Sequence, residues 1–163
     1  NIYHPDMVPI KLINYIAFFS LGSRLYKLRE RTGLFYAAFG CWASGAGKEV
    51  GFDYVGAILS PDKAGHAQTQ IKSLIKELSE NGVSDEEIAS ARQLYLKTLI
   101  DAISTNGSLA SIFGTLEAFQ LGFDYYDKVL QRIQTIGTAE LNNICTKYFS
   151  TNKMTTIRAG RIG

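Results

Sequence analysis

The chain has few of the residues that build metal sites and disulfide frameworks. Its 163 residues include only two cysteines, Cys41 and Cys145, and two histidines, His4 and His66. Two cysteines are too few for a disulfide-rich secreted fold. We interpret them as small buried hydrophobic residues, with one bridge between them left open. No H-x-x-E-H, H-E-x-x-H or C-x-x-C occurs, and catalytic zinc usually needs three protein ligands. We therefore expect no metal and no cofactor to be bound by this chain itself.

Other scarcities exclude whole classes of protein. Three prolines and 15 glycines exclude collagen and low-complexity disorder. A net charge of +2 is too small to indicate nucleic acid, and no apolar run approaches the roughly 18 residues of a membrane span. We expect neither a nucleic-acid partner nor a membrane span. The few cysteines and the lack of a targeting segment favour a bacterial cytoplasm or periplasm, and a start at Asn1 rather than Met is typical of a fragment or a processed product.

The first part of the chain predicts a long helical stretch. Apolar residues recur at helical spacing over residues 7–31, with Asp6 placed to cap the start and Gly33 placed to end it. Gly22 lies inside the stretch and marks either a kink or a break into two helices. The 163 residues are enough for one domain with a real core.

Two strands follow the opening helical stretch. Residues 34–43 and 51–60 are rich in aromatic and β-branched residues, and the loop 44–50 between them is too short for a parallel crossover. The sequence therefore predicts an antiparallel pair. Both faces of the first strand carry apolar residues, so we expect both to be largely covered. The loop contains GAGK, but Glu49 follows its lysine and a strand comes next, which favours a hairpin loop over a phosphate-binding loop.

The remainder predicts several helices and a closing strand. Ser84 and Glu87 form a capping box at the start of one helix, and residues 153–159 predict a final strand. Strands and helices that are segregated in this way indicate an α+β fold in which an antiparallel sheet packs against several helices as a two-layer sandwich. The sheet is thin for so many helices, so we expect a strand to be missing before Asn1.

Several motifs resemble the pitrilysin family of zinc metallopeptidases, which includes insulin-degrading enzyme (insulysin) and the mitochondrial processing peptidases. The chain has GSRL at 22–25, LRE at 28–30 and GLFY at 33–36, in the order and spacing of the family. HPD at 4–6 resembles the segment that opens this helix, and NGVSDEEI at 81–88 resembles a later helix start. The resemblance therefore covers nearly the whole chain.

The resemblance implies an organisation in pairs of homologous domains. One domain of the active pair carries H-x-x-E-H and the zinc, and its zinc-free partner closes over the substrate. This chain is similar to the zinc-free, C-terminal partner, so residues 1–163 are expected to form a single α+β domain of a larger peptidase. Domains of the family begin with a strand before the opening helix, consistent with the missing strand. Zinc is then expected in the partner domain, and the implied partners are that domain and a peptide substrate.

The resemblance also implies two site residues. Zinc-free domains of active members supply an arginine and, seven residues later, a tyrosine, which match Arg29 and Tyr36. A tyrosine hydroxyl can donate a hydrogen bond to the oxyanion of a tetrahedral intermediate, and a guanidinium can hold substrate carbonyls. The residues alone allow a plainer alternative, in which Arg29 pairs with Glu30 or another acid and Tyr36 is an ordinary sheet residue. For Arg24 we expect a structural role, tying its helix to neighbouring elements.

Two functions remain open from the sequence. The first is a substrate-binding domain that helps to bind peptide and to stabilise the tetrahedral intermediate while zinc-dependent hydrolysis takes place in another domain. The parent protein would then be a metalloendopeptidase, although this chain alone is not catalytic. The alternative is an inactive structural or assembly subunit of the same family. In either case we expect an isolated copy to self-associate as a homo-oligomer, because uncovered sheet edges seek partners.

Overall fold

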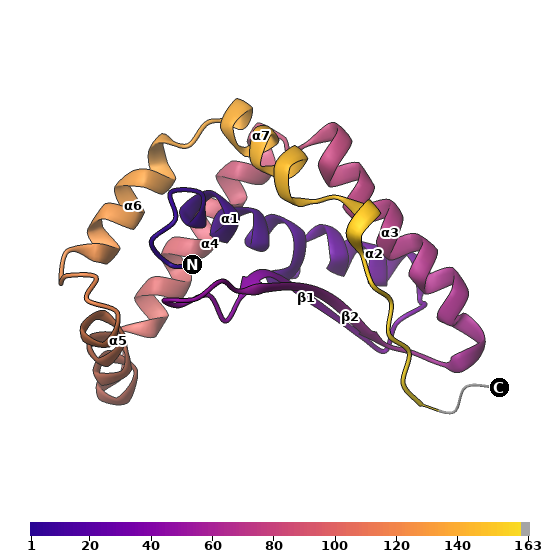
Figure 1. The fold of residues 1–163 in the computed structure, drawn as a ribbon, viewed down its shortest axis with the longest axis horizontal. Coiled ribbons are helices and arrows are strands. Elements are labelled where there is room, and N and C mark those ends of the chain that lie inside the picture. The colour runs from indigo at the N-terminus through magenta and orange to yellow at the C-terminus, as the bar shows by residue number, and fades with distance from the viewer. Residues whose placement is uncertain (161–163) are drawn as a thin grey trace.

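A layer of helices covers one face of a two-stranded sheet in the computed structural model, which describes residues 1–160 (Figure 1). The elements in chain order are α1 (Met7–Asn14), a π-helical turn (Tyr15–Phe19), α2 (Arg24–Thr32), β1 (Ala37–Ser44), β2 (Phe52–Ile58), a 3₁₀ turn (Pro61–Lys63), α3 (Ala64–Asn81), α4 (Asp85–Ala102), α5 (Asn106–Ala118), α6 (Tyr125–Thr135), α7 (Thr138–Tyr148) and a second 3₁₀ turn (Thr151–Lys153). This arrangement is the α+β, two-layer fold that the sequence predicted.

The opening helical stretch is broken, not merely kinked. The π-helical turn ends α1, and the chain leaves helical geometry around Gly22 before α2 begins. The side chain of Ser23 caps α2 by accepting a hydrogen bond from the backbone N–H of Tyr26. Gly33 ends α2 in the left-handed conformation, with φ +58° and its N–H donated to the carbonyl oxygen of Arg29.

Asp6 stands at the predicted cap position of α1 but does not cap it through its side chain. Its carboxylate instead accepts hydrogen bonds from Lys147 and from the hydroxyl of Tyr148, both at 2.7 Å. The Lys147 ammonium therefore holds the pKa of Asp6 below its ordinary value, although partial burial opposes this. Asp6 thus joins the start of α1 to the end of α7.

The two strands are antiparallel, as expected, with Ala37 opposite Ile58 and Cys41 opposite Tyr54. A bulge interrupts the pairing between Cys41 and Ser44. The side-chain amide of buried Asn14 bonds the backbone N–H and carbonyl of Trp42 within this bulge, at 2.8 and 3.0 Å. A polar side chain from α1 therefore satisfies backbone groups that the neighbouring strand leaves unpaired.

The inner face of the sheet is close-packed against the helical layer. The ring of Trp42 stacks between Phe18 and Phe149, with ring centroids 5.0 and 4.4 Å away. Phe18 also lies directly over Gly40, where an added Cβ would come within 2.8 Å of the ring. This packing fixes the hairpin relative to α1 and α7.

The outer face of the sheet is uncovered, and the expectation that both faces are covered is wrong. Because the helices lie on one side of the hairpin, with α5 beyond its turn end, the other side faces solvent (Figure 1). We call four large side chains there the sheet-face strip: Phe39, Phe52, Tyr54 and Ile58, which are 47%, 63%, 37% and 57% exposed.

The predicted final strand at 153–159 is also wrong. The described part of this segment has no regular secondary structure after the second 3₁₀ turn. It is fastened to α3 by Gln68, which donates to the hydroxyl of Thr156 and accepts from the guanidinium of Arg158. Residues with high β-propensity form a strand only where they pair with the edge of a sheet, and the described part of this segment pairs with neither β1 nor β2.

Candidate functional site

The start of α2 is held by a dense polar network around Arg24. Its Nε and Nη2 atoms each donate to a different carboxylate oxygen of Glu87 at 2.7 Å, and Nη2 also donates to the carbonyl oxygen of Gly82 at 2.7 Å. Glu87 in turn completes the predicted capping box of α4 with Ser84. This network confirms the expected structural role of Arg24, because it ties α2 to the turn between α3 and α4.

Hydrogen bonds to Glu87 decide its protonation. Burial by itself raises the pKa of Glu87, but the hydrogen bonds from Arg24 and from the backbone of Ser84 outweigh it, so the pKa lies below the ordinary 4.5. The reciprocal bonds raise the pKa of Arg24. The pair is therefore ionised at neutral pH.

The end of α2 carries Arg29, whose guanidinium has few partners. Its Nη1 atom lies 3.5 Å from the carboxylate of exposed Glu30, at the limit of a hydrogen bond. Its Cζ atom is 5.6 Å from the centroid of the Tyr26 ring, and its Nε atom is buried without a hydrogen-bond partner among the described residues. Arg29 therefore keeps most of its five N–H donors available to another acceptor.

Tyr36 stands at the entry to β1 with its side chain 81% exposed. Its backbone is nonetheless held in place. The N–H of Tyr36 donates to the carbonyl oxygen of Ile58 at 2.8 Å, and the two preceding residues, Leu34 and Phe35, are buried in the core. A fixed backbone with a free phenol is suited to presenting a hydrogen-bond donor to a molecule outside the chain.

Arg29 on α2 and Tyr36, immediately before β1, are thus joined by the short segment that Gly33 begins. Within residues 1–160 no hydrogen bond joins their side chains. The pairing of Arg29 with Glu30 that the plainer alternative expects is present, as an ion pair of 3.5 Å. Whether Arg29 and Tyr36 act on a substrate is not tested by this arrangement and stays a prediction.

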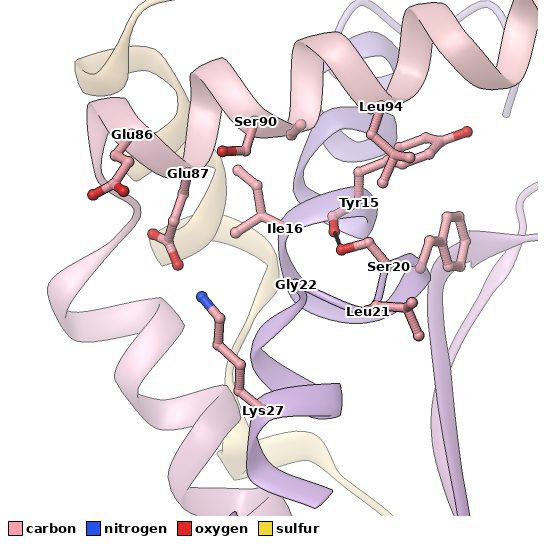
Figure 2. A pocket seen from close by; sticks show the side chains of 12 residues that line it. Tyr15, Ile16, Ser20, Leu21, Gly22, Lys27, Glu86, Glu87, Ser90 and Leu94 are labelled. Carbon is pink, nitrogen blue, oxygen red and sulfur yellow. Dashed lines mark hydrogen bonds between the residues drawn. The ribbon is translucent and has the colours of Figure 1, made fainter. Parts of the chain in front are cut away.

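A separate open groove of about 620 Å³ lies between the break before α2 and the first half of α4 (Figure 2). Neither Arg29 nor Tyr36 lines it. Its polar end is formed by Lys27 and the carboxylates of Glu86 and Glu87, and Figure 2 shows Lys27 reaching toward Glu87. Since Glu87 is already bonded by Arg24, its carboxylate is not free for another molecule, and most of the remaining groove surface is apolar.

The residues that the structure describes do not fit a zinc ion. Within residues 1–160 no three His, Cys, Asp or Glu side chains are grouped to hold a metal. His66 is exposed on α3, His4 lies beside Asp6, and both cysteines are free, with burial raising the pKa of Cys145 to about 11. In the same part of the chain, no helix is long and apolar enough to cross a membrane.

The sheet-face strip was missed at the level of sequence. Its period-two pattern on β2 (Phe52, Tyr54 and, after Gly56, Ile58) is visible in the sequence, but that pattern alone does not say which face is covered. The exposure follows from the side on which the helices pack, a tertiary property.

Comparisons with known proteins agree with the fold. The family described as the peptidase M16 inactive domain matches residues 1–95. None of the curated proteins compared matches the chain.

Several solved structures share the fold at low identity. An M16 inactive domain from Pseudomonas fluorescens is 17% identical with a TM-score of 0.77, over 88% of this chain and 34% of that one. The inactive peptidase domain of a candidate zinc protease from Bordetella parapertussis is 19% identical with a TM-score of 0.76, over 91% and 80%. A protease from Helicobacter pylori is 17% identical with a TM-score of 0.73, over 91% and 36%.

This chain therefore spans about a third of the Pseudomonas and Helicobacter chains and most of the Bordetella one. The family match covers more than half of the present sequence and includes the motifs at 22–36. The chain belongs to the peptidase M16 (pitrilysin) family, as a copy of its inactive domain.

Proposed function

We propose that this chain is the substrate-holding domain of a larger metallopeptidase, in which Arg29 and Tyr36 contact the peptide while hydrolysis takes place on a zinc-bearing H-x-x-E-H domain. The zinc would lie entirely in that partner, in the same polypeptide or in another subunit, and would supply the activated water. Family membership supports the pairing, because the matched domain is the inactive one.

The observation that carries the proposal is the contrast between a fixed backbone and a free side chain at Tyr36. Its N–H is bonded to Ile58, while its side chain is 81% exposed. A phenol held in this way can donate to the carbonyl oxygen of a bound peptide, and the bond strengthens as negative charge develops on that oxygen. Because the backbone of Tyr36 is fixed, only its side-chain torsions have to be ordered when the peptide binds.

Arg29 would act mainly in binding. Its guanidinium has one weak polar contact, to Glu30, so its Nη atoms can donate to a peptide without breaking strong existing bonds. A planar fork of N–H donors suits the carbonyl oxygens of an extended peptide.

The test uses the full-length protein together with its H-x-x-E-H domain and an internally quenched peptide. Tyr36→Phe should lower kcat by roughly 10²–10³ with little change in KM, since removing one oxyanion donor has that effect. Tyr126→Phe on α6 is the matched control and should leave kcat unchanged. Arg29→Gln should raise KM more than it lowers kcat.

The alternative function, a structural or assembly domain, predicts a different result. An unchanged kcat in Tyr36→Phe together with an unchanged KM in Arg29→Gln, measured in an active assembly, would remove both residues from the mechanism and favour that alternative.

A further inference from the structure

An aromatic ring on α2 lies against the guanidinium of Arg29. Tyr26 and Arg29 are three residues apart on this helix, so their side chains are neighbours on its surface. The Cζ atom of Arg29 is 5.6 Å from the centroid of the Tyr26 ring, within the range of a cation–π contact. The sequence motif that includes Arg29 and Tyr36 gives no role to this ring.

We propose that Tyr26 is a positioning residue for the proposed reaction, because its ring holds the Arg29 guanidinium in the orientation in which the Nη atoms meet the peptide. This inference rests on the proposed function, since Tyr26 acts only through Arg29. Its own observations are the orientation of the guanidinium, the kind of contact that fixes it, and the fixed backbone beneath the ring.

The Arg29 guanidinium is turned with its Nε atom inward. Nε is buried without a hydrogen-bond partner among the described residues. Nη1 lies 3.5 Å from the carboxylate of Glu30, whose side chain is 60% exposed. A guanidinium is planar, so holding its Nε side also sets the direction of both Nη groups. A peptide that arrives from solvent can therefore meet the Nη edge but not Nε.

The contact with the ring fixes Arg29 without using its donors. Arg24 on the same helix is fixed in the other way, since its Nε and Nη2 atoms both donate to the carboxylate of Glu87. Within residues 1–160 the hydrogen bonding of Arg29 is limited to the 3.5 Å contact of Nη1. The negative face of a ring attracts a cation but occupies none of its N–H groups. The ring therefore leaves the Nη donors available for a peptide, whereas a carboxylate in its place would occupy them.

The ring of Tyr26 stands on a fixed part of the backbone. The N–H of Tyr26 donates to the side-chain oxygen of buried Ser23 at 3.3 Å, which caps the helix. Two residues before Tyr26, Arg24 ties the same turn to Glu87 and Gly82. The half-buried side chain of Tyr26 therefore extends from a turn that is held on both sides.

Glu30 is the other residue that could orient Arg29. Its contact is at the limit of a hydrogen bond, and exposed ion pairs of this kind contribute little. Glu30→Gln should therefore change KM less than twofold. A larger rise in KM for Glu30→Gln than for Tyr26→Leu would assign the positioning role to Glu30 and overturn the inference.

The test uses the full-length protein together with its H-x-x-E-H domain and an internally quenched peptide. Tyr26→Leu should raise KM about threefold with kcat unchanged, because Arg29 loses the contact that orients it. Tyr26→Phe keeps the ring and should have the wild-type KM. Tyr126→Leu replaces another half-buried helical tyrosine, on α6, and should leave both constants unchanged.

Two further measurements separate positioning from a general contribution to the fold. In a protein that already carries Arg29→Gln, Tyr26→Leu should not raise KM further, because the two residues act as one unit. Replacement of Tyr26 by phenylalanine with one, two or three ring fluorines keeps the shape of the ring but weakens its negative face, so KM should rise with the number of fluorines. This series also decides the question if melting curves show that Tyr26→Leu has lost its fold.

Four results would overturn the inference. They are an unchanged KM in a folded Tyr26→Leu variant, an equal rise in KM when Arg29→Gln is already present, a KM that does not depend on fluorination, and a raised KM in Tyr26→Phe. The last result would mean that the hydroxyl of Tyr26, not its ring, is responsible.

The same variants separate this inference from the proposed function. If Arg29→Gln raises KM but Tyr26→Leu does not, the proposed function stands and the positioning role of Tyr26 is wrong. If Arg29→Gln leaves KM unchanged, the proposed contact of Arg29 with the peptide is wrong, and the role of Tyr26 is wrong with it.

Discussion

The two arginines Arg24 and Arg29 lie on the same helix, little more than one turn apart, and each has one buried guanidinium nitrogen without a hydrogen-bond partner among the described residues. Their other contacts differ. Arg24 makes three hydrogen bonds of 2.7 Å, to Glu87 and Gly82. Arg29 makes one contact at 3.5 Å, to an exposed carboxylate. The N-terminal end of α2 therefore contributes to the stability of the fold. The second end leaves most of the Arg29 donors unused, which is the arrangement expected where a ligand completes the bonding.

Removing Arg24 should have the largest effect on folding. Arg24→Ala would leave the carboxylate of Glu87, whose side chain is only 23% exposed, without its cation. Breaking one partner of such a pair leaves an uncompensated charge, and we expect a loss of about 3 kcal/mol in the free energy of unfolding. Urea denaturation measures it. Arg29→Ala is the matched control and should cost less than about 1 kcal/mol. Equal losses would erase the contrast between the two ends of α2.

The glycines that end α3 and α2, Gly82 and Gly33, also differ in how closely neighbouring atoms surround them. Gly82 has φ +66° and ψ −146°, and an added Cβ would lie 2.0 Å from Asn142 Oδ1, the atom that accepts the N–H of Val83. Gly82→Ala should therefore destabilise the fold by about 2–3 kcal/mol. Gly33 has φ +58° but open space around it, so Gly33→Ala should cost only about 1 kcal/mol. The two losses are compared by thermal unfolding, and a larger loss at Gly33 would contradict this account.

Acid should lower the free energy of unfolding in part by protonating Glu87, the partner of Arg24. Although burial raises the pKa of Glu87, its hydrogen bonds lower it below 4.5. Because the pKa of Glu87 is lower in the folded than in the unfolded state, its carboxylate stabilises the fold fully above about pH 4.5. This stabilisation is lost as the pH falls through the lower folded-state pKa. Wild-type stability should therefore decline below pH 4.5, and the decline should be shallower in Arg24→Ala. Urea midpoints from pH 3 to pH 7 measure both slopes, and parallel slopes would show that other carboxylates are responsible.

Features that depend on short stretches of sequence were predicted well. The stop at Gly33, the capping box at Ser84 and the antiparallel hairpin depend on residues that are close in the chain, and all are confirmed. Asp6, the predicted cap, stands at the start of α1 but does not cap it through its side chain. The structural role of Arg24 was also expected, although its partner Glu87 was not named. The sequence places Arg24 on one element and Glu87 on another, and only the tertiary fold brings them together.

What the sequence missed depends on contacts between distant segments. The predicted final strand is absent because the described part of that segment pairs with neither edge of the sheet, and Gln68 of α3 holds it instead. The binding of Asn14 to the backbone of Trp42 and the exposure of the sheet-face strip depend on how the helices cover the hairpin. For the candidate site, Arg29 and Tyr36 came from the family motif, and the structure adds the details of their surroundings that a motif does not contain.

The smallest effect on folding should come from the proposed site itself. The phenol of Tyr36 makes no hydrogen bond within residues 1–160 and its side chain is 81% exposed, so Tyr36→Phe should change the free energy of unfolding by less than about 0.5 kcal/mol. Tyr148→Phe is the contrasting control, since its hydroxyl donates to Asp6 at 2.7 Å, and it should cost about 1 kcal/mol. Urea denaturation of both variants gives the comparison. A loss above about 1 kcal/mol in Tyr36→Phe would mean that the phenol serves the fold, and any accompanying loss of turnover could then no longer be attributed to contact with a peptide.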